Sequence, residues 1–201
     1  VIENGRDYYG VMPLSGKLLN CRGDNKEKQF YSSKVIINLK RIIGLQEKKV
    51  YNDISSLRYT KILIMTDQDV DGSHIKGLLI NFLSRWPSLM KFEGFISCLL
   101  TPIVKVSKKS KVISFYNLAD FQKWSEKNKE KGWHSKYYKG LGTSTPNEAK
   151  EYFRDFKNLV YKWEEENNKS DNSIDLAFNP KRADDRKTWL RGYEMDRVIN
   201  S

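Results

Sequence analysis

The spacing of apolar residues predicts a chain in which helices and strands alternate. Positions 35, 36, 39, 42 and 43 follow helical spacing, and Gly44 stands where it can end that helix. Residues 61–65 contain a short apolar run of the kind that a parallel sheet buries on both faces. An amphipathic helix is expected from Ile75 to Leu83, with Ser73 as its N-cap and Pro87 beyond its end.

The second half of the chain continues this mixture. Two strands, a helix, a third strand and a further helix are expected in the order 95–106, 111–116, 118–129, 133–138 and onward from Pro146. The polar stretch 164–173 is predicted to be a solvated loop. A final helix is expected over 182–196, and because it meets no stop signal, we expect the chain to be part of a larger protein.

Composition agrees with a folded chain that has a real core. The chain has 201 residues, of which 39% are hydrophobic and 12% aromatic, enough for one or two domains. No apolar run approaches the roughly 20 residues of a membrane span, and the N-terminal residues lack the features of a secretory signal. Cys21 and Cys98 can form one bridge at most, and this cysteine usage favours a reducing compartment.

The net charge is the most informative feature of the composition. Lysine and arginine total 36 against 25 acidic residues, which gives +11 at pH 7. A positive field of this size favours a polyanionic partner, nucleic acid before an anionic membrane. Numerous surface lysines on an ordinary protein would give the same number, so the position of the charges has to decide.

An acidic loop follows the predicted strand 61–65 directly. Asp67, Asp69 and Asp71 occupy alternating positions before Gly72. Three carboxylates at close range raise one another's pKa unless a cation is present, and hard oxygen ligands suit Mg²⁺. The plainer alternative is a solvated turn that caps the next helix.

Three kinds of metal loop can be compared with this one. An EF-hand is excluded, because it needs an acidic residue where Leu78 stands and a helix rather than a strand before the loop. A phosphatase of the haloacid dehalogenase type has a similar motif, but usually lacks an acid where Asp71 stands. The third kind is a metal site that serves phosphodiester chemistry.

The motifs resemble the TOPRIM region of type II DNA topoisomerases, in the branch of eukaryotes and large viruses. The loop and its helix carry Thr-Asp-Gln-Asp followed by Ser-His-Ile-Lys-Gly, and other segments match in order and spacing. The segments that carry the resemblance are 9–20, 64–82, 101–106, 137–144 and 184–190. Together they extend over nearly the whole chain.

The resemblance implies roles for particular residues. Asp67 and Asp69 match the Mg²⁺ ligands of the family, and Asp71 matches a supporting third carboxylate. The positions that match DNA contacts are Lys17, Asn20, Arg186 and Lys187. Basic and amide side chains suit phosphate and sugar oxygens.

Further candidates for phosphate contact are His74, Lys76 and Lys139. The glycine turn that begins at Lys139 could let the backbone approach a phosphate, although a purely structural turn explains it equally well. For His74, an ordinary polar residue in the first turn of a helix is the simpler interpretation.

The expected fold class is α/β, a Rossmann-like TOPRIM core with a mostly parallel sheet and flanking helices, followed by a smaller α/β segment. We expect the core over 1–105, the extension over 106–178, and the start of a winged-helix DNA-binding region over 179–201. The expected function is that of a fragment of an ATP-dependent type II topoisomerase, which cuts and rejoins both strands of duplex DNA. A phosphatase of haloacid dehalogenase type and a non-catalytic nucleic-acid-binding module are the alternatives.

Several parts of such an enzyme are expected outside this chain. They are the catalytic glutamate, the tyrosine that attacks the strand, and the domain that uses ATP. The expected cofactor is Mg²⁺, with Mn²⁺ or Ca²⁺ as substitutes, and the expected partners are duplex DNA and a second copy of the full-length enzyme, with no membrane. Ser15 stands where the family commonly has arginine, which removes one cation from the matching loop. The location implied is the nucleus, or the cytoplasm for a viral enzyme.

Overall fold

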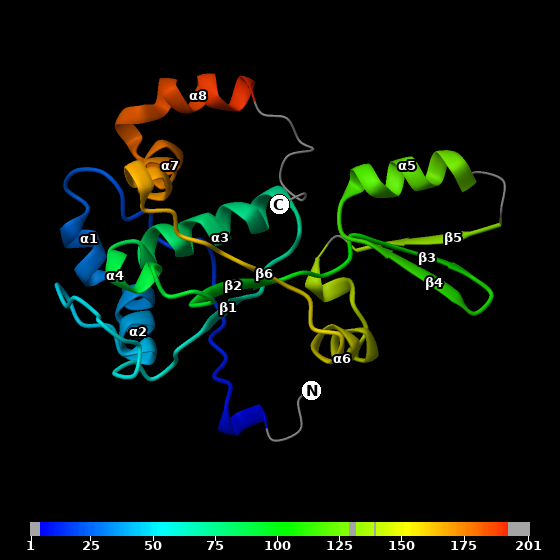
Figure 1. Cartoon of the computed structure of the whole chain (residues 1–201), viewed down its shortest axis with the longest axis horizontal. Coiled ribbons are helices and arrows are strands. Elements are labelled where there is room, and N and C mark those ends of the chain that lie inside the picture. The colour runs from blue at the N-terminus through cyan, green and yellow to red at the C-terminus, as the bar shows by residue number, and fades with distance from the viewer. Residues whose placement is uncertain (1–4, 129–131, 139, 193–201) are drawn as a thin grey trace.

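Two small sheets with helices beside them make up the chain in the computed structural model (Figure 1). The structure describes residues 5–128, 132–138 and 140–192. The first sheet has the strand order β1 (Ile62–Ile64), β2 (Ile96–Leu99) and β6 (Asn158–Val160). The second has the order β4 (Lys111–Phe115), β3 (Val104–Lys108) and β5 (His134–Tyr137). The α/β class expected from the sequence is confirmed.

Strand direction differs from the expectation of a mostly parallel sheet. Strands β1 and β2 are parallel, with Ile62 opposite Ile96, and helix α3 (Val70–Leu83) makes the crossover between them. Strand β6 joins β2 antiparallel, and both ladders of the second sheet are antiparallel. The short apolar run identified β1 as buried, but the pairing of β6, about 60 residues after β2, is a long-range contact that a local pattern does not carry.

The remaining helices occupy the connections. The α-helices are α1 (Glu27–Ser32), α2 (Lys34–Ile43), α4 (Pro87–Met90), α5 (Leu118–Asn128), α6 (Pro146–Arg154), α7 (Lys169–Phe178) and α8 (Ala183–Arg191). Single turns of 3-10 helix are η1 (Gly5–Asp7), η2 (Leu141–Thr143), η3 (Glu166–Asn168) and η4 (Pro180–Arg182). The predicted helix ending at Gly44 is confirmed, since Gly44 follows α2 with a left-handed φ of 89°.

Several expected boundaries are wrong. Asp69 rather than Ser73 caps α3, so that helix begins at Val70. The strand expected over 95–106 is two strands in different sheets, because the chain leaves β2 at Leu99 and passes Pro102, which has no N–H for a ladder, before β3. The loop expected over 164–173 contains η3 and the start of α7. Helix α8 ends at Arg191, and residues 193–196 of the predicted helix lie outside the described residues.

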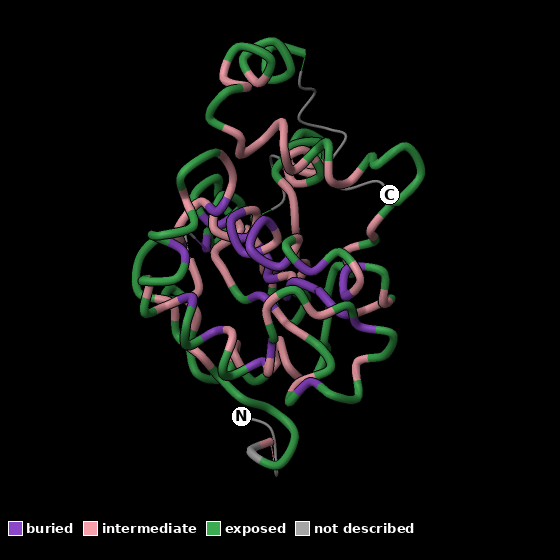
Figure 2. Tube along the Cα trace, turned by 90° about the vertical axis from the view of Figure 1, so that its left-hand side faces the viewer, coloured by how far each residue is buried: buried purple, intermediate pink, exposed green. Residues whose placement is uncertain are grey.

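The main core forms around α3. Phe82 and Leu83 are fully buried there against Phe30 and Ile36 from α1 and α2, and Trp86 meets the edge of the Phe82 ring. Figure 2 shows the buried positions gathered in the middle of the molecule. A separate small core lies between the second sheet and α5, built on Val104, Val106 and Phe115. The first sheet and α3 therefore form one packed unit, and the second sheet has its own.

A partly buried polar network ties α7 to this main core. Arg22 Nε donates to Asn81 Oδ1 at 3.1 Å, and its Nη2 donates to Asp171 at 2.6 Å. The Asn81 side chain is 1% exposed and also donates to Asn20, whose own amide reaches the Phe178 carbonyl at 2.8 Å. Buried polar groups are stable in a folded protein only when they have hydrogen-bond partners. These bonds therefore fix the position of α7 on α3.

Two further observations concern the chemistry of the whole chain. Among the described helices, none has the length and apolar character that crossing a membrane requires. Cys21 and Cys98 are both buried and both free. Burial raises the pKa of the Cys21 thiol to about 11, which keeps it as a neutral, unreactive thiol.

The Arg22 network yields a stability prediction. Arg22→Met keeps the length of the side chain but leaves the buried Asn81 amide oxygen and the Asp171 carboxylate without this donor. We expect a loss of about 2–3 kcal/mol in the free energy of unfolding, measured by chemical denaturation. Arg41→Met, at an exposed position of α2, is the matched control. A loss at position 22 no larger than at position 41 would contradict the assignment.

Candidate metal site and nucleic-acid interface

The acidic loop connects the end of β1 to the start of α3. Its shape depends on Gly72, where a Cβ atom would lie 2.0 Å from the Asp67 carbonyl oxygen. The first turn of the helix can therefore approach the loop only with glycine at this position. Asp69 accepts a hydrogen bond from the Gly72 N–H at 2.7 Å and so caps the helix. The carboxylate most favourable for the helix is also one of the predicted metal ligands.

Asp67 contacts a turn that lies more than seventy residues further along the chain. Its Oδ1 atom accepts a hydrogen bond from the Leu141 N–H at 2.7 Å. At Gly140 a Cβ atom would come within 2.6 Å of Asp67 Oδ2. The glycine turn after β5 therefore lies against a carboxylate of the chain itself, and Leu141 is a positioning residue that the sequence analysis missed. The only local signal for it was the Gly-x-Gly pattern.

Polar contacts between the second sheet and α6 hold this turn from both sides. Glu148, the third residue of α6, forms a capping box with Thr145 and accepts hydrogen bonds from Lys136 Nζ at 3.0 Å and from the Tyr138 hydroxyl. Nearby, Lys105 of β3 forms an ion pair with Glu151 at 3.1 Å. The glycine turn thus connects β5 to α6, and these contacts hold that strand and that helix together.

These contacts shift the pKa values of both partners. Burial by itself would raise the pKa of Glu148, but the hydrogen bonds from Tyr138, Thr145 and Lys136 outweigh it and lower the pKa to about 2. Burial and the Glu148 carboxylate raise the pKa of Tyr138 well above its ordinary value. Near neutral pH the pair is therefore a phenol donating to a carboxylate.

The three aspartates do not gather into one cluster. Asp71 lies in the first turn of α3 with an exposed side chain and pairs with Lys17 at 3.7 Å. Within residues 5–128, 132–138 and 140–192 no group of three acidic, histidine or cysteine side chains is close enough to hold a metal ion.

The donor set still fits a magnesium site of the water-rich kind, in which one or two carboxylates suffice. Asp67 and Asp69 each use one carboxylate oxygen in a hydrogen bond with the described part of the chain. The other oxygen of each carboxylate is the one that a cation could share.

Several predicted contact residues have internal partners. Asn20 belongs to the Arg22 network, where its oxygen and its amide nitrogen are both used. Lys76 is buried, and its Nζ donates to the Gln68 amide oxygen at 3.3 Å. The exposed His74 ring stacks on Phe178 with the centroids 6.1 Å apart. Asn20 and His74 thus support the packing of α3 against α7, and Lys76 joins α3 to the acidic loop, tasks that the sequence analysis did not anticipate.

The two predicted contacts near the C-terminus differ from each other. Arg186 donates to the carbonyl oxygens of Leu176 and Asn179 at 3.0 and 3.2 Å, which fastens α8 to the end of α7. Lys187 is exposed, and within the described part of the chain its ion pair is with Asp184 of the same helix, at 2.7 Å. Lys139 lies outside the described residues.

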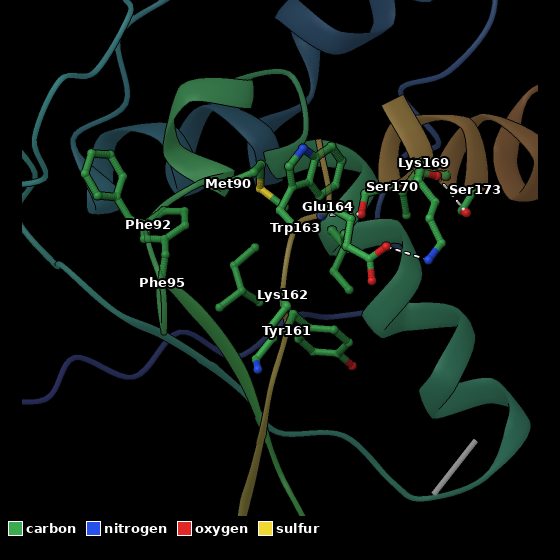
Figure 3. A pocket seen from close by; sticks show the side chains of 13 residues that line it. Met90, Phe92, Phe95, Tyr161, Lys162, Trp163, Glu164, Lys169, Ser170 and Ser173 are labelled. Atoms are coloured by element: carbon green, nitrogen blue, oxygen red, sulfur yellow. Dashed lines mark hydrogen bonds and ion pairs between the residues drawn. The ribbon is translucent and has the colours of Figure 1, made fainter. Parts of the chain in front are cut away.

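A cavity elsewhere in the chain contains none of these residues. It has a volume of about 330 Å³ and lies between α4, β2 and the segment that leads from β6 into α7. Figure 3 shows Met90, Phe95 and Trp163 around it, with the ion pair of Glu164 and Lys169 at one side. Its lining is mainly apolar, so it does not suit a phosphate or a metal ion.

Two family comparisons cover almost the entire chain. Residues 2–97 match the family described as the Toprim domain, and residues 99–201 match the C-terminal associated domain of TOPRIM. The chain therefore belongs to the family of Toprim proteins that carry this associated domain. The family resemblance drawn from the sequence motifs is confirmed.

The relatives narrow this class further. The chain is 52% identical over 200 residues to DNA topoisomerase 2 of Plasmodium falciparum. This match covers 98% of the chain and 14% of that protein. It is 52% identical to mouse DNA topoisomerase 2-alpha, over 96% of this chain and 13% of the relative.

The solved structures give the same result. A crystal structure of the Plasmodium falciparum topoisomerase II DNA-binding, cleavage and re-ligation domain matches with a TM-score of 0.88 and 49% identity. The match covers 96% of this chain and 26% of that chain. The chain thus spans only a small part of the length of its type II topoisomerase relatives.

The contact between Asp67 and the glycine turn can be tested with two glycines of the same turn. Gly140→Ala brings a methyl group against the Asp67 carboxylate, whereas Gly142→Ala meets no atom within 4 Å. We expect Gly140→Ala to lower the free energy of unfolding by about 1–3 kcal/mol. Gly142→Ala should change it by less than about 0.5 kcal/mol in the unfavourable direction. Equal effects in thermal or chemical unfolding would show that the turn does not lie against Asp67.

The depressed pKa of Glu148 predicts a pH dependence of stability. Its pKa falls from 4.5 to about 2 on folding, so its stabilising effect is complete above pH 4.5 and is lost as the pH falls towards 2. At neutral pH the free energy of unfolding of the wild-type chain should exceed that of Glu148→Gln by about 1–2 kcal/mol, allowing for solvent screening. The two unfolding curves should converge in acid. A difference that stays constant between neutral pH and pH 3 would contradict this role.

Proposed function

We propose that this chain supplies metal-binding carboxylates and DNA-backbone contacts to an ATP-dependent type II DNA topoisomerase. Such an enzyme cuts both strands of one duplex, passes a second duplex through the gap and rejoins the ends. The observation that carries the proposal is the acidic loop between β1 and α3, in a chain half identical to DNA topoisomerases 2 over nearly its full length. The same comparisons favour this function over a phosphatase of haloacid dehalogenase type.

The chemistry proposed for the loop follows from its carboxylates. Asp67 and Asp69 would hold the divalent cation, Mg²⁺ in the first instance, with Asp71 in support. A bound cation supplies positive charge that stabilises phosphate oxygens when a strand is cut and rejoined. Asp69 is oriented by the Gly72 N–H and Asp67 by the Leu141 N–H, so both carboxylates are positioned before any ligand arrives. Preorganised oxygens bind a cation without reordering the loop.

The DNA contacts proposed from the resemblance differ in accessibility. Lys17 and Lys187 have exposed side chains that can neutralise phosphates directly. Asn20 and Arg186 have internal partners, so their contribution to DNA binding would be to keep the 17–22 segment and α8 in place. His74, Lys76 and Lys139 remain candidates for phosphate contact. Of the two that the structure describes, His74 is exposed and Lys76 is buried.

The wider setting belongs to the same proposal. The parent enzyme would use ATP through a domain outside this chain, act as a homodimer and work in the nucleus, as suits relatives from mouse and Plasmodium. The glutamate and tyrosine of strand cleavage would come from outside this chain. Residues 1–105 would be the TOPRIM core, 106–178 its extension and 179–201 the start of a winged-helix region.

A chimaeric enzyme tests the proposed role of Asp67. The chain replaces its matching segment in mouse DNA topoisomerase 2-alpha, which is 52% identical over 198 residues. We expect the chimaera to cleave duplex DNA when Mg²⁺ is present. Asp67→Asn should lower cleavage by at least about a hundredfold, because the amide cannot offer a charged ligand to the cation.

The exposed Asp71 provides the matched control in the same chimaera. Asp71→Asn should retain most of the cleavage, since that carboxylate is given only a supporting role. Thermal unfolding of both variants separates a lost ligand from a lost fold. Full cleavage by a folded Asp67→Asn enzyme would remove Asp67 from the metal site.

A further inference from the structure

The hairpin of β3 and β4 carries a concentration of positive charge that takes no part in the proposed metal site. From Thr101 to Asn117 the chain has four lysines and no acidic residue. Lys105 has a partner in Glu151 of α6. The other three, Lys108, Lys109 and Lys111, lie at the hairpin tip and form no ion pair with any residue that the structure describes.

The lysines at the tip carry two local energetic costs. Lys108 and Lys111 are directly opposite each other in the antiparallel ladder, and like charges in that position repel. Lys109 has a φ of 53°, a left-handed conformation that costs a residue with a Cβ atom about 1 kcal/mol. A polyanion bound at the tip would turn the first of these costs into an attraction.

The surroundings leave the tip accessible. One face of the second sheet packs on Phe121 and Trp124 of α5. The other face contacts α6 through Lys105 and Lys136, which form ion pairs with Glu151 and Glu148. The next row towards the tip consists of Ser107, Val112 and His134, of which Val112 is 59% exposed. In Figure 1 the turn between β3 and β4 lies at the opposite end of the molecule from α1 and α2.

We propose that the tip of the β3–β4 hairpin, residues 107–112, is a second DNA-contact surface that binds the phosphate backbone of a duplex without reading its sequence. The three lysines neutralise phosphates, and the hydroxyls of Ser107 and Ser110 suit the same oxygens. Lysine serves here as a point charge, and no side chain of the tip has the paired donors and acceptors that distinguish bases. The choice of duplex DNA as the polyanion rests on the proposed function.

The effect on binding can be estimated from counterion release. Each phosphate neutralised contributes about 0.9 to the slope of log affinity against log salt concentration. Three lysines that each neutralise one phosphate therefore account for about 2.7 of that slope. Their loss should weaken duplex binding by roughly tenfold or more at low salt.

The experiment measures binding of the 201-residue chain to a fluorescent DNA duplex by anisotropy over a range of KCl concentrations. The test variant is Lys108→Gln/Lys109→Gln/Lys111→Gln. The control is Lys28→Gln/Lys34→Gln/Lys48→Gln, which removes the same charge from exposed positions and includes a second left-handed lysine, Lys48. A third variant with arginine at 108, 109 and 111 keeps the charge.

We expect the test variant to lose roughly tenfold in affinity and to show the shallower slope, while the control and the arginine variant stay near wild type. Equal losses in test and control variants would mean that only net charge matters, and would overturn the hairpin surface. The hairpin surface would also be overturned if the test variant keeps its affinity for DNA but aggregates. Lysines on edge strands prevent pairing between sheets of different molecules, and that result would assign this role to them.

Two further outcomes separate this inference from the proposed function. If the wild-type chain binds no duplex even at low salt, the DNA contacts proposed for the chain fail as a whole. If it binds vesicles of phosphatidylserine and phosphatidylcholine through the same lysines more tightly than DNA, the hairpin surface serves a membrane and the inference is wrong.

Discussion

The close approach of two glycines to Asp67 is the constraint on which the candidate site depends. Gly72 lets the first turn of α3 reach the Asp67 backbone, and Gly140 lets a distant turn reach its carboxylate. Side chains at either position would push the acidic loop away from the element that orients it. The hydrogen bond from the Leu141 N–H then fixes one carboxylate oxygen and leaves the other for a ligand.

Rigidity at this point is supplied from outside the loop. The second sheet and α6 are joined by Lys136, Tyr138 and Glu148, and the glycine turn runs between them. The Arg22 network binds α7 to α3 at Asn81, so the helix that follows the loop is also held near its C-terminal end. The loop is thus anchored at both ends by contacts between residues far apart in the chain, which suits a site that must keep its geometry.

The distribution of charge suggests a division of labour within the chain. Asp67 and Asp69 lie in the loop where a cation would be needed, while Lys17, Lys187, Lys109 and Lys111 are exposed on other elements. A net charge of +11 alone would fit many proteins. Its placement on exposed side chains of separate elements is what favours an extended polyanion over a small anionic ligand.

Local patterns determined the α/β class, most helices and strands, the end of α2 at Gly44 and the identity of the acidic loop, because spacing and capping are short-range properties. The family motifs likewise needed only the sequence. The antiparallel return of β6, the contact of Asp67 with Leu141 and the internal partners of Asn20 and Arg186 came only from the tertiary structure. All of these except the Arg186 contacts join residues far apart in the chain, which a local pattern does not carry. A polar side chain also has the same local pattern whether its partner is a phosphate or another part of the chain.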